Sequence, residues 1–484
     1  MVKKTKNFKN KIGLIFLTAT LSLSLAACST STTNNNSTET QTTSNNINNK
    51  DYFSTKDLTG IYDENNATKI NLTNSAISGN GATLESNILK ITSEGTYILS
   101  GQGDNVQVVI ETDDTAKVQI VLDNVSISNN DSAIYVKQAD KVFLTLKEGT
   151  VNTIKDSSNN STESGSAAIY SKSDLTINGK GELNVEGNYS NAIKSNDDLK
   201  IAYATLNVTA QKHALSANDA LNITNATLKL NSTEDAIHSD NSENADLGNV
   251  YLKDNNITIN AGDDGIHATN KVLIDGGQIN IEKSNEGIEG KVVTIESGEI
   301  NITSKDDGIN AADGTTTTQS RPGMASSGVE LIINGGKITV NAGGDGLDSN
   351  GNITINDGEV YVNGPTDKGN AALDYDGNAT INGGTTVILG SSGMAQGFGN
   401  SSKQASIMAN VQGYADAKIV VKDYTGKEIV SYTATKNFSN ILVSSPNIKY
   451  GEKYTISIDG KETTVTASLI TKAQGSMMGN TPRR

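Results

Sequence analysis

The chain has 484 residues, with 46 Gly, 4 Pro, no Trp and a formal net charge of −15. Hydrophobic residues make up 35% of it and charged residues 19%, which excludes both a membrane-embedded protein and a disordered polyelectrolyte. Abundant Gly with so little Pro excludes collagen. The acidic balance argues against a nucleic-acid partner, because binding phosphates requires a surface rich in Lys and Arg. It favours cations instead.

The N-terminus has the pattern of an export signal. Five Lys between Lys3 and Lys11 precede an apolar stretch over 12–25, which leads into Ala26, Ala27 and Cys28. The single Cys excludes a disulfide framework and stands where a bacterial lipoprotein carries its lipid; an ordinary cleaved signal with an incidental Cys is the alternative. We expect a signal peptide over 1–27 and lipidation of Cys28. The mature chain then has 34 basic and 54 acidic residues, a net charge of −20, and is anchored at the outer face of the cytoplasmic membrane.

Changes in composition divide the rest of the chain. A stretch of Ser, Thr, Asn and Gln cannot bury enough apolar surface to fold, whereas short alternating strands with Asn, Asp and Gly turns follow it. The sequence predicts a disordered linker over 28–50, an N-terminal β region or cap over 51–131, repeated coils over 132–390, a C-terminal β cap over 391–472 and a disordered tail over 473–484.

An internal repeat decides the fold class. Its frame is two alternating apolar residues, a four-residue turn and two more alternating apolar residues, and its basic period is about 22 residues. Examples are Leu221/Ile223/Leu228/Leu230, Val272/Ile274/Ile279/Ile281, Val293/Ile295/Ile300/Ile302 and Ile353/Ile355/Val360/Val362. Because alternate residues of a strand share one face, these positions would stack into a continuous core. We predict an all-β parallel β-helix, with loop insertions at 239–247 and 312–327 on its working face.

A second signature precedes each frame, and it places acidic residues in two rows. Each coil carries a motif such as Asp264-Gly-Ile-His267, in which the Ile points inward and the first and fourth residues do not. The first position stacks Asp235, Asp264, Glu286, Asp307 and Asp345; the fourth stacks His238, His267, Glu289, Asn310, Asp348 and Asp374. Carboxylates about 4.8 Å apart repel by roughly 3.5 kcal/mol at an effective dielectric constant near 20. Bound cations would offset this repulsion.

The donor chemistry selects the cation. Flexible surroundings made only of oxygen donors favour Ca²⁺ over Zn²⁺, Cu²⁺ or Mg²⁺. We expect two or three Ca²⁺ ions, bound by Asp263, Asp264, Glu286, Glu289, Asp306, Asp307, Asp345 and Asp348, with Asp235 at the edge. The alternative is a solvated acidic face whose carboxylates accept hydrogen bonds from turn amides. We interpret His238 and His267 as exposed neighbours of the rows and not as a zinc site, since a third nitrogen or sulfur ligand is lacking.

With these motifs in view, the chain resembles a family of bacterial exported polysaccharide-binding proteins. The similar segments are GTYILSG at 95–101, VQIVLDNVSI at 118–127, SAIYVKQADKVFLTL at 132–146, DDGIHA, EGIEG, DDGINA, GGDGLDSNG, ALDYDG, GMAQGFGNSSKQASI at 393–407 and SSPNIKYGEKYTI at 444–456. The resemblance implies a right-handed, calcium-containing β-helix related in fold to pectate lyases. It also implies binding of plant-wall polysaccharides such as cellulose and acidic pectic chains. We expect the chain to be a monomer.

Three functions remain open from the sequence. A non-catalytic binding module would stack sugars on Tyr such as Tyr251, Tyr361 or Tyr375, because Trp is absent. A calcium-dependent polysaccharide lyase would need a Lys or Arg base beside the ion, and Lys305, Lys337 and Lys368 are the candidates. A structural adhesin is the third. The binding module is the function that we expect.

Overall fold

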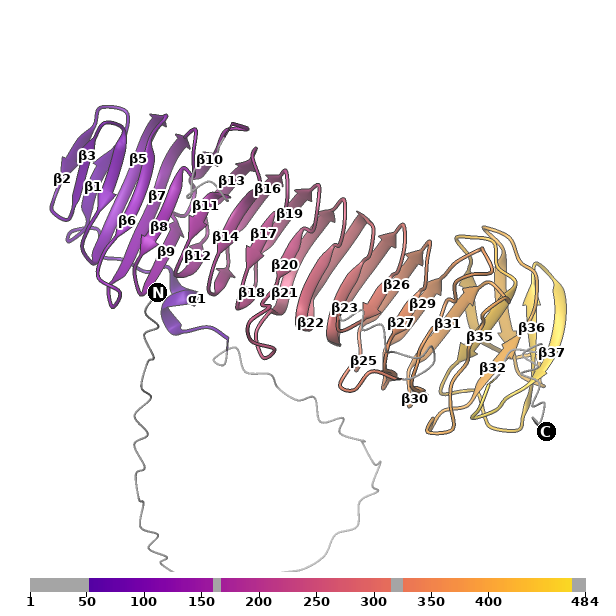
Figure 1. The fold of residues 1–484 in the computed structure, drawn as a ribbon. Helices are drawn as coiled ribbons and strands as arrows, with labels where there is room; N and C mark the ends of the chain where they lie inside the picture. The colour runs from indigo at the N-terminus through magenta and orange to yellow at the C-terminus, as the bar shows by residue number, and fades with distance from the viewer. Residues whose placement is uncertain (1–51, 160–166, 315–324, 472–484) are drawn as a thin grey trace, which may run out of the picture. The chain divides into compact units, whose positions relative to one another are not determined.

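The computed structural model describes residues 52–159, 167–314 and 325–471, and all of them belong to one compact unit, Ile47–Arg484. The expected signal peptide, Cys28, the linker, the tail and most of the 312–327 insertion lie outside the described residues. Apart from the short helix α1 (Thr55–Thr59), the regular structure of the described residues is β. Its main sheet contains 33 strands, most of which pair in parallel with the corresponding strand of the next coil (Figure 1).

The parallel strands form three rows, and each row contributes one strand or strand segment per coil. The first row is β4 (Ile88–Ile91), β6 (Gln107–Glu111), β8 (Ile134–Gln138), β11 (Ala167–Ser171), β14 (Asn191–Ser195), β17 (Leu215–Ala217), β20 (Ile237–Ser239), β22 (Ile266–Ser284), β23 (Ile288–Ser304), β24 (Ile309–Ala311) and β27 (Leu347–Ser349). The long strands β22 and β23 continue into the other two rows.

The second and third rows follow the two halves of the repeat frame. The second is β1 (Thr68–Asn71), β5 (Gly95–Asp104), β7 (Lys117–Ser128), β9 (Lys141–Leu146), β12 (Asp174–Gly179), β15 (Leu199–Ala202), β18 (Ala220–Thr224), β21 (Asn249–Asn260), β22, β23, β25 (Glu330–Ile333), β28 (Asn352–Ile355) and β30 (Ala379–Ile381). The third continues from β7 through β10 (Val151–Lys155), β13 (Glu182–Gly187), β16 (Thr205–Ala210), β19 (Thr227–Ser232), β21, β22, β23, β26 (Lys337–Ala342), β29 (Glu359–Asn363) and β31 (Thr385–Gly390).

The apolar positions of the repeat form one continuous core. Ile223 pairs through Leu252 with Ile274, which pairs with Ile295, and none of these side chains is exposed. Each coil therefore buries its apolar side chains against those of its neighbours, as the alternation predicts. The prediction of an all-β, solenoid-like parallel sheet is confirmed. The right-handedness of the β-helix and a general coil length of about 22 residues stay predictions.

A glycine turn between the second and third rows lets successive coils approach closely. Gly277 has a φ of +88°, and a Cβ at this position would lie 2.3 Å from the carbonyl oxygen of Asn255 on the preceding coil. Only glycine adopts this conformation without strain and also leaves room for the neighbouring backbone. The Gly-rich turns of the repeat thus serve the stacking of coils.

Antiparallel strands occur at both ends of the described chain. At the N-terminal end β1 pairs with β2 (Ala76–Ser78) and β3 (Ala82–Glu85) pairs with β4. At the C-terminal end β31 and β32 (Ser406–Ala409) pair with β35 (Asn440–Ser444), and a separate four-stranded sheet is formed by β34 (Glu428–Thr433), β33 (Lys418–Lys422), β36 (Lys453–Ile458) and β37 (Lys461–Thr466). Parallel pairing already begins within 51–131, at β1 and β5.

Helix α1 is fixed to the flank of the solenoid by one buried carboxylate. Asp57 completes a capping box with Ser54, and its Oδ1 lies 2.8 Å from Nζ of Lys141 and accepts a hydrogen bond of 2.6 Å from Thr176. Burial opposes the charge of Asp57, but the hydrogen bonds from Lys141 and Thr176 outweigh it, so its pKa is lowered. No helix among the described residues is long and apolar enough to cross a membrane.

Candidate functional site

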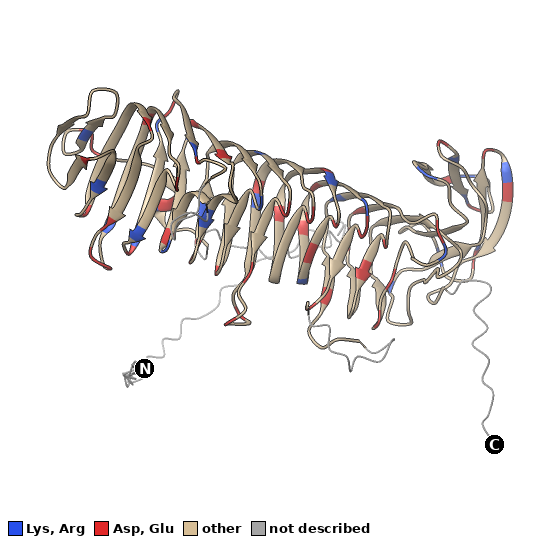
Figure 2. Cartoon of the chain, turned by 45° about the horizontal axis from the view of Figure 1, so that its top comes forward, with Lys and Arg blue, Asp and Glu red and all other residues tan. Residues whose placement is uncertain are grey.

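The fourth positions of the motif form the row that the sequence predicts. Strand register pairs His238 with His267, His267 with Glu289, Glu289 with Asn310, and Asn310 with Asp348. In Figure 2 acidic positions of neighbouring middle coils follow one another along the stack. The side chains of this row project from the first row of strands, because the intervening Ile or Leu of each motif is buried.

The first positions form a ladder of carboxylates and backbone amides beside it. Oδ1 of Asp235 accepts a hydrogen bond of 3.0 Å from the amide of Asp264, and Oδ1 of Asp307 accepts one of 2.6 Å from the amide of Asp345. Oδ1 of Asp345 in turn accepts one of 2.5 Å from the amide of Ala371. One oxygen of each of these carboxylates thus satisfies a turn amide, as the alternative interpretation of the acidic face requires, and the other oxygen remains for a further partner.

Histidines contact the carboxylates in the N-terminal part of the two rows. Nδ1 of His238 lies 2.7 Å from Oδ2 of Asp235, and Nδ1 of His267 lies 2.7 Å from Oε2 of Glu289 and 3.3 Å from Oδ2 of Asp264. Burial opposes the charge of His267, but hydrogen bonds to Asp264 and Glu289 outweigh it and raise its pKa to about 10. The expectation that His238 and His267 are exposed is therefore wrong: they are half-buried because neighbouring carboxylates draw their rings into the rows.

The C-terminal part of the rows consists of oxygen donors. Asp307, Asp345 and Asp348 each present a carboxylate oxygen, and the three oxygens lie within 4.8 Å of one another. Beside them, Nδ2 of Asn310 donates a hydrogen bond of 3.0 Å to Glu286, while Oδ1 of Asn310 is buried without a hydrogen-bond partner among the described residues. Asn310 itself lies in the fourth-position row between Glu289 and Asp348.

The pKa values show how strongly these carboxylates interact. Burial is the largest cause, and neighbouring carboxylates add to it. The pKa of Asp348 is raised to about 8, that of Glu286 to about 8, that of Asp345 to about 7 and that of Asp307 to about 6. Crowded, half-buried carboxylates favour either protons or a cation.

Close approach of the backbone also shapes this end. A Cβ on Gly344 would lie 2.3 Å from Oδ1 of Asp306 and 2.5 Å from Oδ1 of Asp307. The absence of a side chain at this position allows both carboxylates to converge. Asp306 is exposed, as is Asp263 on an earlier coil, where Asp235, Asp263 and Asp264 also bring carboxylate oxygens within 4.8 Å of one another.

These residues fit Ca²⁺ best at the C-terminal part of the rows. Ca²⁺ takes about six to eight oxygen ligands from carboxylates, amide carbonyls and water. The carboxylates of Asp307, Asp345 and Asp348, together with the unpartnered Oδ1 of Asn310, would supply such donors. Asp235, Asp264 and Glu289 fit it less well, because their carboxylates already contact histidine.

The three Lys residues that were candidates for the lyase base are distributed over the surface of the coils. Lys337 is on β26 in the third row of strands, 3.4 Å from Oε1 of Glu299, and Lys305 and Lys368 are exposed. The sequence interpretation missed Lys194, which lies in the fourth-position row two coils before His238. Burial and then the charge of Lys212 lower the pKa of Lys194. Its place in the motif Asn191-Ala-Ile-Lys194 was the available signal.

The Tyr residues considered as sugar platforms are all in contact with other parts of the chain. Tyr251 is 1% exposed and its ring stacks on that of Tyr52, with ring centroids 3.8 Å apart. Tyr361 stacks on Tyr432 at 5.0 Å, and the hydroxyl of Tyr375 donates to the carbonyl of Gly397.

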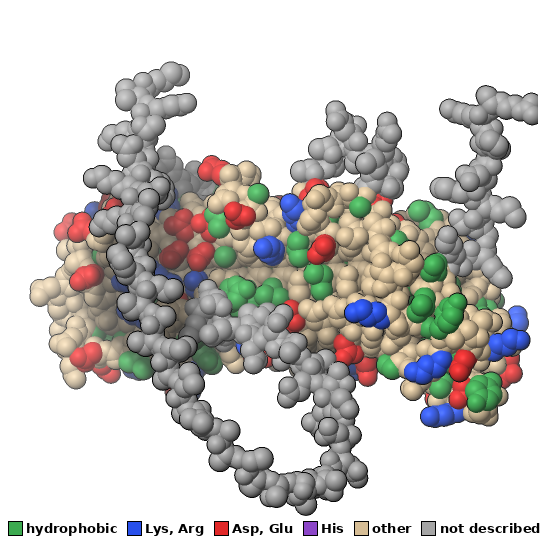
Figure 3. All heavy atoms as spheres, turned by 90° about the horizontal axis from the view of Figure 1, so that it is seen from below, with side chains coloured by type: hydrophobic (Ala, Val, Ile, Leu, Met, Phe, Trp, Pro, Cys, Tyr) green, Lys and Arg blue, Asp and Glu red, His purple; other side chains and the backbone are tan. Residues whose placement is uncertain are grey.

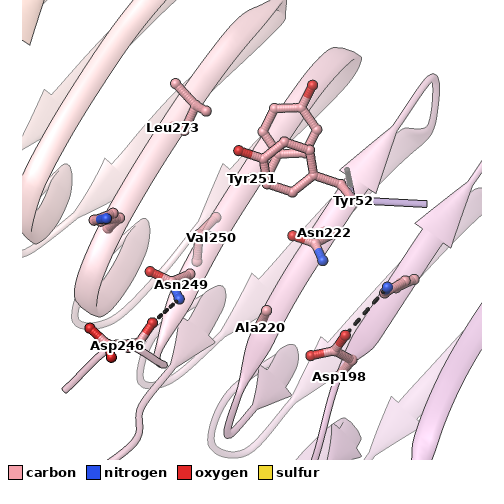
Figure 4. A pocket seen from close by; sticks show the side chains of 11 residues that line it. Tyr52, Asp198, Ala220, Asn222, Asp246, Asn249, Val250, Tyr251 and Leu273 are labelled. Carbon is pink, nitrogen blue, oxygen red and sulfur yellow. Dashed lines mark hydrogen bonds and ion pairs between the residues drawn. The ribbon is translucent and has the colours of Figure 1, made fainter. Parts of the chain in front are cut away.

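The Tyr52 ring borders a cleft of about 380 Å³ on the outside of the second row of strands (Figure 4). Besides Tyr52 and Tyr251, its lining includes the polar residues Asp198, Lys200, Asn222 and Asn249. Figure 4 shows the two Tyr rings stacked above Asn222. Elsewhere in the lining, Lys200 and Asp198 form an ion pair of 3.3 Å. An aromatic ring beside hydrogen-bonding groups is a suitable surface for a sugar.

The surface seen in Figure 3 is mostly uncharged and polar. Polar side chains and backbone cover most of that face, and hydrophobic and charged side chains lie in small groups. Such a face offers hydrogen bonds along the stack of coils and has no dominant hydrophobic patch in this view.

Known proteins were compared with the chain. Residues 85–326, half of the chain, match the family described as carbohydrate-binding domain-containing protein. The chain belongs to this family. A carbohydrate-binding domain-containing protein of Acetivibrio thermocellus is 35% identical over 136 residues, which are 27% of this chain and 48% of that protein. The chain thus matches about half the length of this curated relative. A polysaccharide lyase-like protein from C. thermocellum, solved as a gadolinium derivative, is 26% identical, with a TM-score of 0.40 over 51% of this chain and 97% of that one.

Proposed function

We propose that the chain is a non-catalytic polysaccharide-binding protein of the bacterial cell surface, built as a right-handed β-helix with coils of about 22 residues. Family membership supports carbohydrate as the ligand. The observation that carries the calcium part of the proposal is the group formed by Asp307, Asp345 and Asp348. Asn310, the register neighbour of Asp348, adds a buried Oδ1 that has no hydrogen-bond partner among the described residues. There Ca²⁺ would neutralise carboxylates such as Asp348, whose pKa is raised by burial and then by the neighbouring carboxylates.

Calcium would also determine which glycans bind. A mature chain with a net charge of −20 repels an anionic chain such as polygalacturonate, and Ca²⁺ overcomes this repulsion by bridging carboxylates of the protein and of the sugar. A neutral chain such as cellulose needs no such bridge. The cleft beside Tyr52, with its aromatic ring and amide groups, supports a separate contact for neutral sugars.

Binding assays with and without EDTA test this division. EDTA is expected to abolish binding to polygalacturonate and to leave most binding to cello-oligosaccharides. Tyr52→Ala should have the opposite effect and weaken only cello-oligosaccharide binding. Equal loss of both ligands on EDTA treatment, with the circular dichroism spectrum unchanged, would contradict the calcium bridge.

A calcium-dependent pectate lyase is the second candidate. Its candidate base in the row of the carboxylates is Lys194, which is half-buried and whose pKa burial lowers. Strand register places Lys194 six coils before Asp348, so it could serve only an ion bound in the N-terminal part of the row. An absorbance assay for the unsaturated product, with polygalacturonate and Ca²⁺, distinguishes the two. A non-catalytic protein forms no product, whereas product that disappears in Lys194→Ala would assign a lyase. A structural adhesin would show no binding on a glycan array with or without Ca²⁺.

Location at the outer face of the cytoplasmic membrane completes the proposal. A lipid on Cys28 would hold the glycan-binding coils outside the cell, with residues 28–50 as the linker. Metabolic labelling with a fatty-acid analogue should mark the wild-type chain but not Cys28→Ser. Labelling of both would contradict lipidation at Cys28.

A further inference from the structure

The three histidines of the chain lie in contact on consecutive coils. The rings of His213 and His238 stack with centroids 3.9 Å apart and an angle of 9° between their planes, and His267 follows at 5.1 Å. Oδ2 of Asp235 lies 2.7 Å from Nδ1 of His238 and 3.4 Å from Nδ1 of His213. One nitrogen of each of these two imidazoles and one carboxylate oxygen of Asp235 therefore lie within 4.8 Å of one another.

His213 supplies a second, independent observation. The residue is 6% exposed, and its Nδ1 has no hydrogen-bond partner among the described residues although it faces Asp235. Buried nitrogens without a partner are uncommon in folded proteins and point to a missing ligand.

The surroundings orient the ring for ligation through Nδ1. Nε2 of His213 lies 3.5 Å from Oε2 of Glu234, which favours the proton on Nε2 and leaves the lone pair on Nδ1. The carboxylate of Asp235 is fixed through its second oxygen, because Oδ1 accepts a hydrogen bond from the backbone amide of Asp264. The side chains of Glu234 and His238 are 47% and 19% exposed, so an ion has a path to the cluster.

We propose that His213, Asp235 and His238 bind a divalent transition-metal ion of the Zn²⁺ class, with a fourth position open to water. Two imidazole nitrogens and one carboxylate oxygen are ligands that suit Zn²⁺, whereas Ca²⁺ takes oxygen. The motif rows then hold two kinds of cation on different coils, a nitrogen-containing site at Asp235 and an oxygen site at Asp345. His267 lies outside the transition-metal site, because Glu289 and Asp264 engage its Nδ1.

Titration of the full chain with Co²⁺ tests the site, because visible absorption reports a tetrahedral nitrogen-containing environment. One equivalent of Co²⁺ should bind, Zn²⁺ should displace it, and millimolar Ca²⁺ should not. His213→Gln and Asp235→Asn are expected to weaken Zn²⁺ binding at least ~100-fold. The matched control His267→Gln removes the adjacent histidine of the stack and should leave Zn²⁺ binding unchanged.

Several outcomes would overturn the proposal: no tetrahedral Co²⁺ spectrum, displacement of Co²⁺ by Ca²⁺, or a Zn²⁺ affinity that His213→Gln leaves intact. Circular dichroism melting shows whether each variant folds. If His213→Gln does not fold, His238→Gln carries the test, since its side chain is more exposed. If the wild-type chain bound no glycan, the proposed function would be contradicted. The result of the metal titration would still decide the transition-metal site independently.

Discussion

At the scale of single residues, position in the rows decides what each acidic side chain does. Asp235 and Glu289 are in contact with histidine, whereas Asp348 lies among carboxylates and beside the row position of Asn310. Asp348→Asn should therefore lower Ca²⁺ affinity by about tenfold or more, since a charged oxygen ligand is lost. Calorimetric titration measures the change. Asp104→Asn, the same substitution at an exposed site on β5, is the control, and an equal loss there would contradict the assignment.

Gly344 provides a steric test of the same site. In Gly344→Ala the new methyl group would push away Asp306 and Asp307, which lie within 2.5 Å of its position, so Ca²⁺ affinity should fall while net charge stays constant. Gly369→Ala is the matched control, because a Cβ there meets only a side-chain oxygen of Asp367 at 3.3 Å. Unchanged Ca²⁺ affinity in Gly344→Ala would place the ion elsewhere.

Prediction from sequence was limited at this scale by contacts between the two rows. The rule that equivalent motif positions stack correctly predicted that His238 pairs with His267. It did not predict that His213, at the first position of its motif, stacks its ring on His238, at the fourth position of the motif on the next coil. Alternation also directs Tyr251, which lies between Val250 and Leu252, away from the main core and into a smaller hydrophobic cluster on the outside of the second row. It could not show that Tyr52, distant in sequence, covers that ring.

At the scale of elements, α1 depends on one carboxylate for its attachment. Asp57→Ala should leave Lys141 buried without its ion-pair partner and destabilise the attachment by roughly 3 kcal/mol, because an unpaired buried charge is costly. Hydrogen exchange at 52–60, by mass spectrometry, measures the local opening.

Asp63→Ala, an exposed position shortly after the helix, is the control for that measurement. Protection of α1 equal to that of the wild type would contradict the role of Asp57. The spacing of Ser54 and Asp57 in the sequence is that of a helix-capping pair. It does not show that the Asp57 carboxylate also contacts Lys141 and Thr176, which are distant in the sequence.

At the scale of the whole molecule, the parallel stacking of the coils could be predicted from the sequence, because the apolar residues of the core recur in each repeat. The same apolar positions recur from Ile223 to Ile355, and each side chain is buried against its equivalent on the next coil. The ends were harder to foresee in detail, because the antiparallel strands there have no repeat to align. Parallel pairing from β1 onward shows that the solenoid begins before the motif becomes recognisable.

The stacked carboxylates should also make stability depend on pH. The pKa values of Asp307, Asp345 and Asp348 are raised above those of the unfolded chain, so the folded state binds more protons between about pH 4 and pH 8. In EDTA the melting temperature should therefore fall as pH rises through this range. Saturating Ca²⁺ should flatten the dependence, since the ion replaces the protons. A melting temperature in EDTA that rises between pH 5 and pH 8 would contradict the crowding of these groups.

Calorimetric titration of the chelator-treated chain with Ca²⁺ at neutral pH is the most direct measurement. The account predicts saturable binding in the wild type that is lost in the double variant Asp345→Asn/Asp348→Asn, together with loss of polygalacturonate binding. Absence of saturable binding, or binding that the double variant retains, would contradict a calcium site among these carboxylates.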